Sequence, residues 1–165
     1  MTEPTAVNGR VLVAVDGSPS SLEALRQGQQ QARLLGTTVL AVAAWHQQNG
    51  IVPPMSYHPE ADSREILHNS IREAFYPDVI SDIDSLTVNG NPADVLIHLS
   101  ADAAVLVVGS RGHSGVVGAM LGSVSARIAA HAHCPVLVVR DPAAERSPQT
   151  LRTTAAVAAL FSESS

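Results

Sequence analysis

Residues 103–128 read AAVLVVGSRGHSGVVGAMLGSVSARI and contain an apolar run, a glycine-rich loop and a helical pattern. The run at 103–108 is apolar throughout, which is typical of a strand buried on both faces of a parallel sheet. The loop at 109–122 contains five glycines. Glycine permits positive φ and close approach to a ligand, but it loses more conformational entropy on folding than other residues. A simple turn does not need five glycines, so their number indicates a second role for this loop.

The same alternation of strand and helix continues along the rest of the chain. Apolar runs predict further strands at residues 10–15, 38–45, 83–88 and 135–140. Helices are expected from Ser18-Pro19, over 60–76, from Asn91-Pro92 and over 123–132. Ser and Asn are favoured caps, and Pro is favoured at the first helical position. Gly36 marks the end of the first helix, and Ile66, Ile71 and Phe75 are expected to face the core from the second.

Strands that alternate with helices join through right-handed crossovers into one parallel sheet. The expected fold is therefore α/β: a single-domain, doubly wound, five-stranded parallel sheet with helices on both faces. In such sheets ligands bind beyond the carboxyl ends of the strands, where the strand order reverses. Asp16 follows the first strand and the glycine-rich loop follows the fourth, so both face one crevice if these strands are neighbours.

Length and composition predict a single domain. The chain has 165 residues, of which 45% are hydrophobic, enough for a real core. We expect a flexible N-terminal segment at 1–8, the domain at 9–141, and a tail at 142–165 that is either a short helix or disordered. Residues 46–59 form a Pro-containing connection that is longer than most loops.

Charge and cysteine content exclude several classes of partner. The net charge is −5, and all ten basic residues are arginine. A nucleic-acid or anionic-membrane surface is therefore not expected, and no apolar run approaches the ~20 residues of a membrane helix. The single cysteine cannot form an internal disulfide, and the polar N-terminus resembles neither a signal peptide nor an anchor. These features predict a cytoplasmic protein.

Several nucleotide and catalytic motifs are absent. A P-loop needs a lysine, and the chain contains none. The G-x-G-x-x-G fingerprint belongs after the first strand, where this chain reads DGSP at 16–19. A phospho-accepting receiver domain could use Asp16, but it also needs an acidic pair and a lysine. There is no G-x-S-x-G elbow either, so no catalytic residue is assigned.

The helix that begins at Gly122-Ser123 has a first turn without Asp or Glu. A helix N-terminus carries unpaired N–H groups and a partial positive charge, which favour an anion. Glycines at 109, 112, 115 and 118 could let backbone amides curl into a nest for phosphate oxygens. The alternative is a flexible loop in which Ser123 is a plain N-cap.

His131, His133 and Cys134 are close together in the sequence but do not predict a metal site. The H-x-H spacing at a helix end splays the two imidazoles, and no second pair of ligands stands at zinc-like spacing. Cys134 precedes a buried strand and is expected to act as a small core hydrophobe.

The spacing Gly109-x2-Gly112-x9-Gly122-Ser123 resembles the nucleotide-loop signature of the universal stress protein family. VLVAVDGSPSSLEAL at 11–25, NGNPADVL at 89–96 and HCPVLVVR at 133–140 support the same resemblance, which covers about residues 9–140. The resemblance implies strand order 3-2-1-4-5, a homodimer, and ATP binding in members that keep these glycines.

The resemblance also implies a set of ligand contacts by position. For the adenosine these are Ala14, Asp16 and Ala44. For the ribose the contact is Gly109. For the phosphates they are Arg111, Gly112, His113, Ser114, Gly115, Gly122, Ser123, Val124 and Ser125. For Asp16, capping of the first helix is a compatible second role.

Three functions follow from these features. The first is an ATP-binding regulatory or stress-response protein, with Mg²⁺ as a candidate companion ion, that forms a homodimer through the edge strand at 136–140. The second is a slow ATP hydrolase or phosphotransferase in the same pocket. Its activity is expected to be weak, because phosphoryl transfer needs cationic clamps and Arg111 is the only nearby cation. The third is an interaction module with an empty loop.

Overall fold

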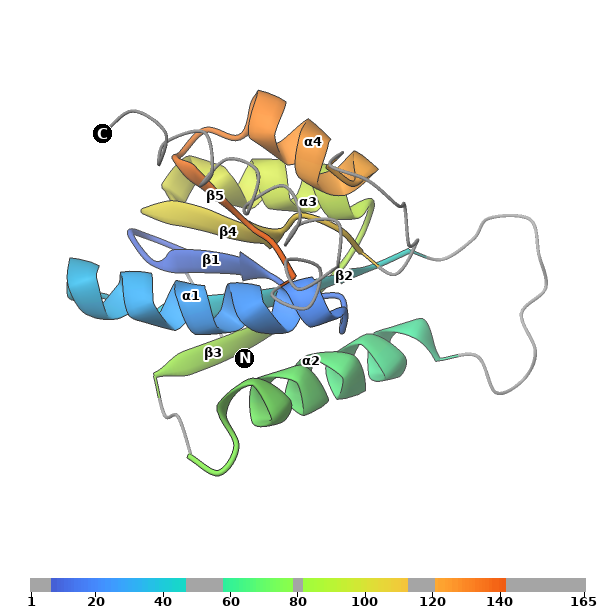
Figure 1. Cartoon of the computed structure of the whole chain (residues 1–165). Coiled ribbons are helices and arrows are strands. Elements are labelled where there is room, and N and C mark those ends of the chain that lie inside the picture. The colour runs from blue at the N-terminus through green and yellow to red at the C-terminus, as the bar shows by residue number, and fades with distance from the viewer. Residues whose placement is uncertain (1–6, 47–57, 79–81, 113–120, 142–165) are drawn as a thin grey trace, which may run out of the picture.

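The computed structural model describes residues 7–46, 58–78, 82–112 and 121–141. Its centre is a five-stranded parallel sheet in the order β3-β2-β1-β4-β5 (Figure 1). The strands are β1 (Val11–Ala14), β2 (Val39–Trp45), β3 (Ile83–Asn89), β4 (Val105–Gly109) and β5 (Val136–Val139). The predicted fold class and strand order are confirmed.

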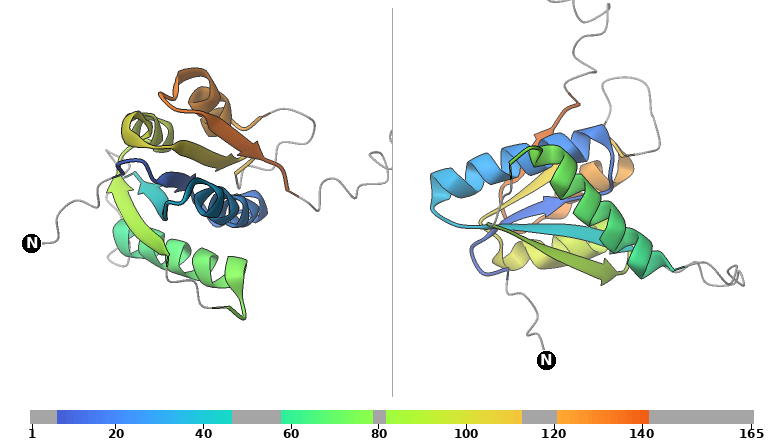
Figure 2. Two further views of the ribbon diagram at one scale, coloured as in Figure 1. Left: turned by 90° about the vertical axis from the view of Figure 1, so that its left-hand side faces the viewer. Right: turned by 90° about the horizontal axis from the view of Figure 1, so that it is seen from below.

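Four α-helices cover the sheet, two on each face (Figure 2). They are α1 (Pro19–Leu35), α2 (Pro59–Phe75), α3 (Pro92–Leu99) and α4 (Ser123–His131), and a short 3₁₀ helix, η1 (Ser100–Asp102), follows α3. Helices α1 and α2 pack side by side on one face, and α3 and α4 pack on the other. None of the helices in the described ranges is both long and apolar enough to span a bilayer.

Local chemistry explains where the helices begin and end. The Ser18 side chain accepts a hydrogen bond from the N–H of Ser21 at the start of α1. At the start of α3, the Asn91 side chain accepts from two backbone N–H groups in the first turn. Gly36 ends α1 in the left-handed region at φ 66°, where a residue without Cβ has no steric penalty. These signals were all readable in the sequence.

The core has two halves, one on each face of the sheet. Alternate residues of each strand point to opposite faces, so Val11 and Val13 pack beneath α1 and α2 while Leu12 packs beneath α3 and α4. Helix α2 buries Leu67, Ser70 and Ala74, and Ile71 and Phe75 pack against the core as predicted. Ile66 is different: it is 41% exposed, so the prediction that it faces the core is wrong.

The topology creates a crevice at the carboxyl edge of the sheet. Strand β1 pairs with β2 on one side and with β4 on the other. The chain leaves β1 toward α1 on one face and leaves β4 toward α4 on the opposite face (Figure 1). The two connections therefore diverge at the point where the strand order reverses, which is where ligand sites open in such sheets.

Candidate functional site

A cavity of about 240 Å³ lies at this crevice. The ends of β1, β2 and β4, the first turns of α1, α3 and α4, and two residues of the first half of α2 line it. The lining includes every predicted site residue within the described ranges: Ala14, Asp16, Ala44, Gly109, Arg111, Gly112, Gly122, Ser123, Val124 and Ser125. His113, Ser114 and Gly115 lie outside those ranges. The sequence thus predicted a set of residues that the fold brings together, while their individual ligand contacts stay predictions.

One end of the cavity is apolar. Ala14, Val42 and Ala44 line it from β1 and β2, and Pro92 and Leu96 line it from α3. Because β2 and β4 flank β1 on opposite sides, this end is displaced along the sheet from the glycine-rich loop. A flat apolar group fits such a wall better than a charged one.

The other end is polar and is formed by residues 109–112 and the start of α4. The backbone N–H of Gly122 donates to the carbonyl of Ser110 at 2.8 Å, and the N–H of Ser110 donates to the carbonyl of Val139 at 2.6 Å. The Ser125 hydroxyl donates to the carbonyl of Gly109 at 2.6 Å. These bonds tie the end of β4 to α4 and β5.

The start of α1 fixes the same loop from the other side. The Asp16 carboxylate accepts from the N–H of Ser18 at 3.0 Å and from the Ser18 hydroxyl at 2.6 Å. The N-cap of α1 is Ser18, so Asp16 holds the capping residue in place and is not itself the predicted cap. The Ser20 hydroxyl donates to the carbonyl of Arg111. The segment 109–112 is therefore held between two helix N-termini before any ligand arrives.

The described glycines of the loop have different reasons to lack a side chain. A Cβ on Gly109 would stand 2.9 Å from the backbone carbon of Ser20, so α1 excludes it. A Cβ on Gly112 would stand 2.7 Å from Asp16 Oδ2. Among the described residues, the atoms nearest to a Cβ on Gly122 would lie 3.6 Å away, which is ordinary contact. Neither packing against the described residues nor its φ of −63° requires glycine at 122, and Gly122 lines the cavity.

The N-terminus of α4 differs from the other described helix starts. Its N-cap is Gly122, which has no side chain to accept a hydrogen bond, and the first turn contains no acid. Helices α1 and α3 have side-chain caps, and α2 has two acids in its first turn. Ser123 lies one residue inside the helix, so it is not the N-cap. The first amides of α4 have no intrahelical acceptors, and they open on the cavity.

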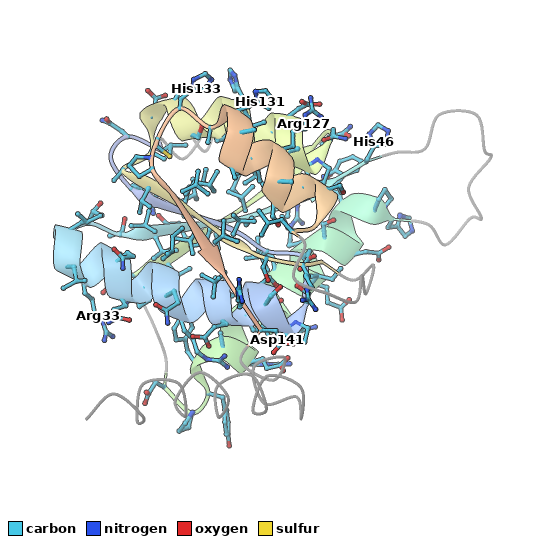
Figure 3. The ribbon with its side chains drawn as sticks, turned by 45° about the horizontal axis from the view of Figure 1, so that its top comes forward. Arg33, His46, Arg127, His131, His133 and Asp141 are labelled. Carbon is cyan, nitrogen blue, oxygen red and sulfur yellow. The ribbon has the colours of Figure 1, made fainter. Side chains whose placement is uncertain are left out.

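The charges lining the cavity are few. Arg111 is the one basic side chain and Asp16 the one acidic side chain among the described lining residues. His131 and His133 lie at the opposite end of α4 (Figure 3). Within the residues that the structure describes, no group of three or more His, Cys, Asp or Glu side chains could hold a metal ion. Burial raises the pKa of the Cys134 thiol above its ordinary value, as expected of a partly buried hydrophobe.

Several lining residues were missed from the sequence. Val42 and Val108 are neighbours of predicted residues on their strands, so strand-end position could have identified them. Ser63 and Ile66 come from the first half of α2. No local signal marks them, because their place depends on how α2 packs against β2, β3 and α1.

Comparison with known proteins gives one consistent result. The model of the universal stress protein family matches residues 8–140. A universal stress protein of Mycolicibacterium smegmatis is 34% identical over 134 residues, covering 79% of this chain and 45% of that protein. Universal stress protein YxiE of Bacillus subtilis is 32% identical over 151 residues, covering 79% of this chain and 98% of that protein. The chain spans about half the length of several curated relatives that it matches, the mycobacterial ones.

Solved structures agree with this result. A crystal structure of a universal stress protein in complex with cAMP is 27% identical, with a TM-score of 0.58, over 81% of this chain and 97% of that one. A universal stress protein from Archaeoglobus fulgidus has 21% identity and a TM-score of 0.60, over 81% of this chain and 99% of that one, and shows the shared fold. The family match, the strand order and the glycine spacing lead to one conclusion: this chain belongs to the universal stress protein family.

Proposed function

We propose that this chain is a stress-response regulatory protein that binds an adenine nucleotide, specifically ATP, in the cavity at the carboxyl edge of its sheet. The observation that carries the proposal is the N-terminus of α4, which faces the cavity without a capping side chain, an acid or a Cβ at Gly122. Such an end favours the oxygens of an anionic group.

The two ends of the cavity match the two halves of a nucleotide. The apolar end, with Ala14 and Ala44, suits a base. The polar end, with Arg111, Gly112 and Gly122, suits phosphate. Asp16 lies between them at the end of β1 and suits a ribose hydroxyl. A companion Mg²⁺ would be held mainly by phosphate oxygens, because Asp16 is the one carboxylate on the described wall.

A related protein supports the choice of ligand class. The universal stress protein that is 27% identical to this chain was solved in complex with cAMP, a ligand with an adenine base and a phosphate. The proposal extends this class to ATP because the chain keeps the Gly109-x2-Gly112-x9-Gly122-Ser123 spacing. The proposed nucleotide domain is residues 9–141, in a cytoplasmic setting.

Isothermal titration of nucleotide-free protein tests the proposal. The ligands are ATP, ADP, AMP and GTP, each with and without Mg²⁺. Micromolar, adenine-selective binding is expected. Gly122→Glu should abolish it, because the new carboxylate fills the space at the helix start with a like charge. Ala129→Glu is the matched control, since it adds the same charge to an exposed position on the same helix.

Two outcomes would contradict the proposal. Undiminished binding in Gly122→Glu would show that the α4 N-terminus is not the phosphate site. Absence of binding to every nucleotide would leave the interaction module as the better function. Fast, metal-dependent hydrolysis that is lost in Asp16→Ala would instead favour the hydrolase.

We also propose a homodimer that pairs through the edge strand at 136–140. Among the described strands β5 pairs with β4 alone, and Val136, Leu137 and Val138 are half-buried in the single chain. Unpaired edge strands of this kind are templates for a second copy. Light scattering at micromolar concentration should give a dimer for the native chain. Val138→Pro should give a monomer, because alternate residues of an edge strand direct their N–H groups outward; a persistent dimer would place the interface elsewhere.

A further inference from the structure

Two residues of the cavity wall come from α2, an element that none of the glycine motifs includes. They are Ser63 and Ile66, which lie three residues apart and so on one face of the helix. Helix α2 packs against β2, β3 and α1. Ser63 and Ile66 therefore line the cavity at the end that β2 forms with Ala43 and Ala44. This end is the one away from α4.

Ile66 is an apolar side chain that is exposed to solvent, which is energetically unfavourable unless something covers it. Five large hydrophobic residues of the described chain are exposed: Leu34, Leu35, Ile66, Tyr76 and Leu121. Of these, Ile66 alone lines the cavity. The side chain is positioned to be covered by whatever fills the space.

Ser63 occupies the next position along the buried face of α2, four residues before the fully buried Leu67. Leu67, Ser70 and Ala74 are buried on this face, whereas Ser63 is half-buried and lines the cavity. A residue the size of leucine there would fill part of the space. The Ser63 hydroxyl has no hydrogen-bond partner among the described residues, so it is available to a ligand.

We propose that Ser63 and Ile66 form the outer wall of the nucleoside half of the site and contribute binding affinity to that half of the ligand. Ile66 packs against the face of the base or ribose, and the Ser63 hydroxyl hydrogen-bonds to a polar atom of the nucleoside. The phosphates lie at the other end, against α4. This inference rests on the proposed function, because it assigns one half of that ligand to α2.

The test compares adenosine, AMP and ATP on three variants. Ile66→Ala should weaken all three ligands by about tenfold, because the lost apolar contact is common to them. Ser63→Ala should weaken all three about three- to tenfold through the lost hydroxyl, and Ser63→Leu should abolish binding by filling the space. His68→Ala is the control, since His68 is exposed on the next turn and does not line the cavity. Titration serves for AMP and ATP, and ligand-observed NMR serves for adenosine.

The outcomes distinguish a failure of this inference from a failure of the proposed function on which it rests. Loss of ATP affinity with unchanged adenosine affinity would place α2 against the phosphates and overturn the inference. Equal affinities in wild type and all Ile66 and Ser63 variants would overturn it while leaving nucleotide binding intact. No binding by the wild-type chain would overturn the proposed function itself. Thermal melts should match wild type for Ile66→Ala, because Ile66 is outside the core.

Discussion

The hydroxyl of Ser125, in the first turn of α4, donates a 2.6 Å hydrogen bond to the backbone carbonyl of Gly109, the last residue of β4. Both residues are buried, and both were predicted to contact the ligand. This bond commits the Ser125 hydroxyl proton to the protein, which leaves its backbone N–H as the donor for a phosphate. The bond positions the helix start whose amides open on the cavity.

Removal of this hydroxyl should therefore affect stability as well as binding. Ser125→Ala leaves a buried acceptor without its partner, which costs about 1–3 kcal/mol. Urea unfolding should show the loss, and nucleotide affinity should fall because α4 is less firmly positioned. Ser123→Ala is the control: Ser123 is exposed, so its unfolding free energy should stay within about 0.5 kcal/mol of wild type. Equal stability of the two variants would contradict this role for Ser125.

The glycines at 109 and 122 should respond differently to the same substitution. Gly109→Ala drives a Cβ against the backbone of Ser20, and overpacking of this kind costs about 1–3 kcal/mol. Gly122→Ala fits among the described protein atoms, so its only stability cost should be the poorer N-cap that alanine makes, while its nucleotide affinity falls. Chemical denaturation and titration of both variants check the prediction. A Gly122→Ala variant with native affinity would mean that no ligand approaches this residue closely.

Substitution of Gln29 should stabilise the fold, in contrast to the substitutions above. The side chain lies in α1, is 5% exposed, and its Oε1 has no hydrogen-bond partner in the part of the chain that the structure describes. An unsatisfied buried polar atom costs about 1–3 kcal/mol, and methionine has a similar length and flexibility. Gln29→Met should raise the midpoint of thermal unfolding. A lower midpoint would show that the amide makes a contribution that burial alone does not reveal.

Cys134 should titrate at higher pH in the folded chain than in the unfolded one. Desolvation by burial raises the pKa of its thiol, and hydrogen bonds with the backbone partly oppose this shift. Because the thiolate is the reactive form, a thiol reagent at pH 8 should label the native chain more slowly than the urea-unfolded chain. Cys134 is the chain's one cysteine, so the signal has a single source.

The same shift has a consequence for stability. A group whose pKa is raised by folding stabilises the fold at pH values below its unfolded pKa, about 8.5 for cysteine, and this contribution is lost as the pH rises through the folded value. The unfolding free energy of the wild type should therefore fall above about pH 8.5 more steeply than that of Cys134→Ala. Parallel pH profiles would contradict the shift.

Much of the fold could be predicted because its signals are local. Ser18-Pro19 and Asn91-Pro92 start helices through contacts within one turn, and Gly36 ends one through its own backbone conformation. Continuous apolar runs indicated strands buried on both faces. The strand order came from the resemblance to a family, since hydrogen bonding between β1 and β4 joins residues far apart in the sequence.

The site was predicted in part for the same reason. The spacing of Gly109, Gly112 and Gly122 is a property of the chain, and the fold brings these residues to one cavity with Asp16 and Ala44. Ile66 was expected in the core because helical periodicity places it near the buried stripe. In the structure Ile66 is instead 41% exposed and lines the cavity.

The sequence by itself determined where helices and strands begin, which loop carries the glycines, and which helix start lacks an acid. Only the tertiary structure decided that Ser20 excludes a side chain at Gly109, that Ser125 bonds to the end of β4, and that α2 supplies Ser63 and Ile66 to the cavity. The physical reason is the distance along the chain over which each interaction acts. Capping and turn chemistry act within a few residues. The contacts of Ser20, Ser125, Ser63 and Ile66 depend instead on which helix packs against which strand end.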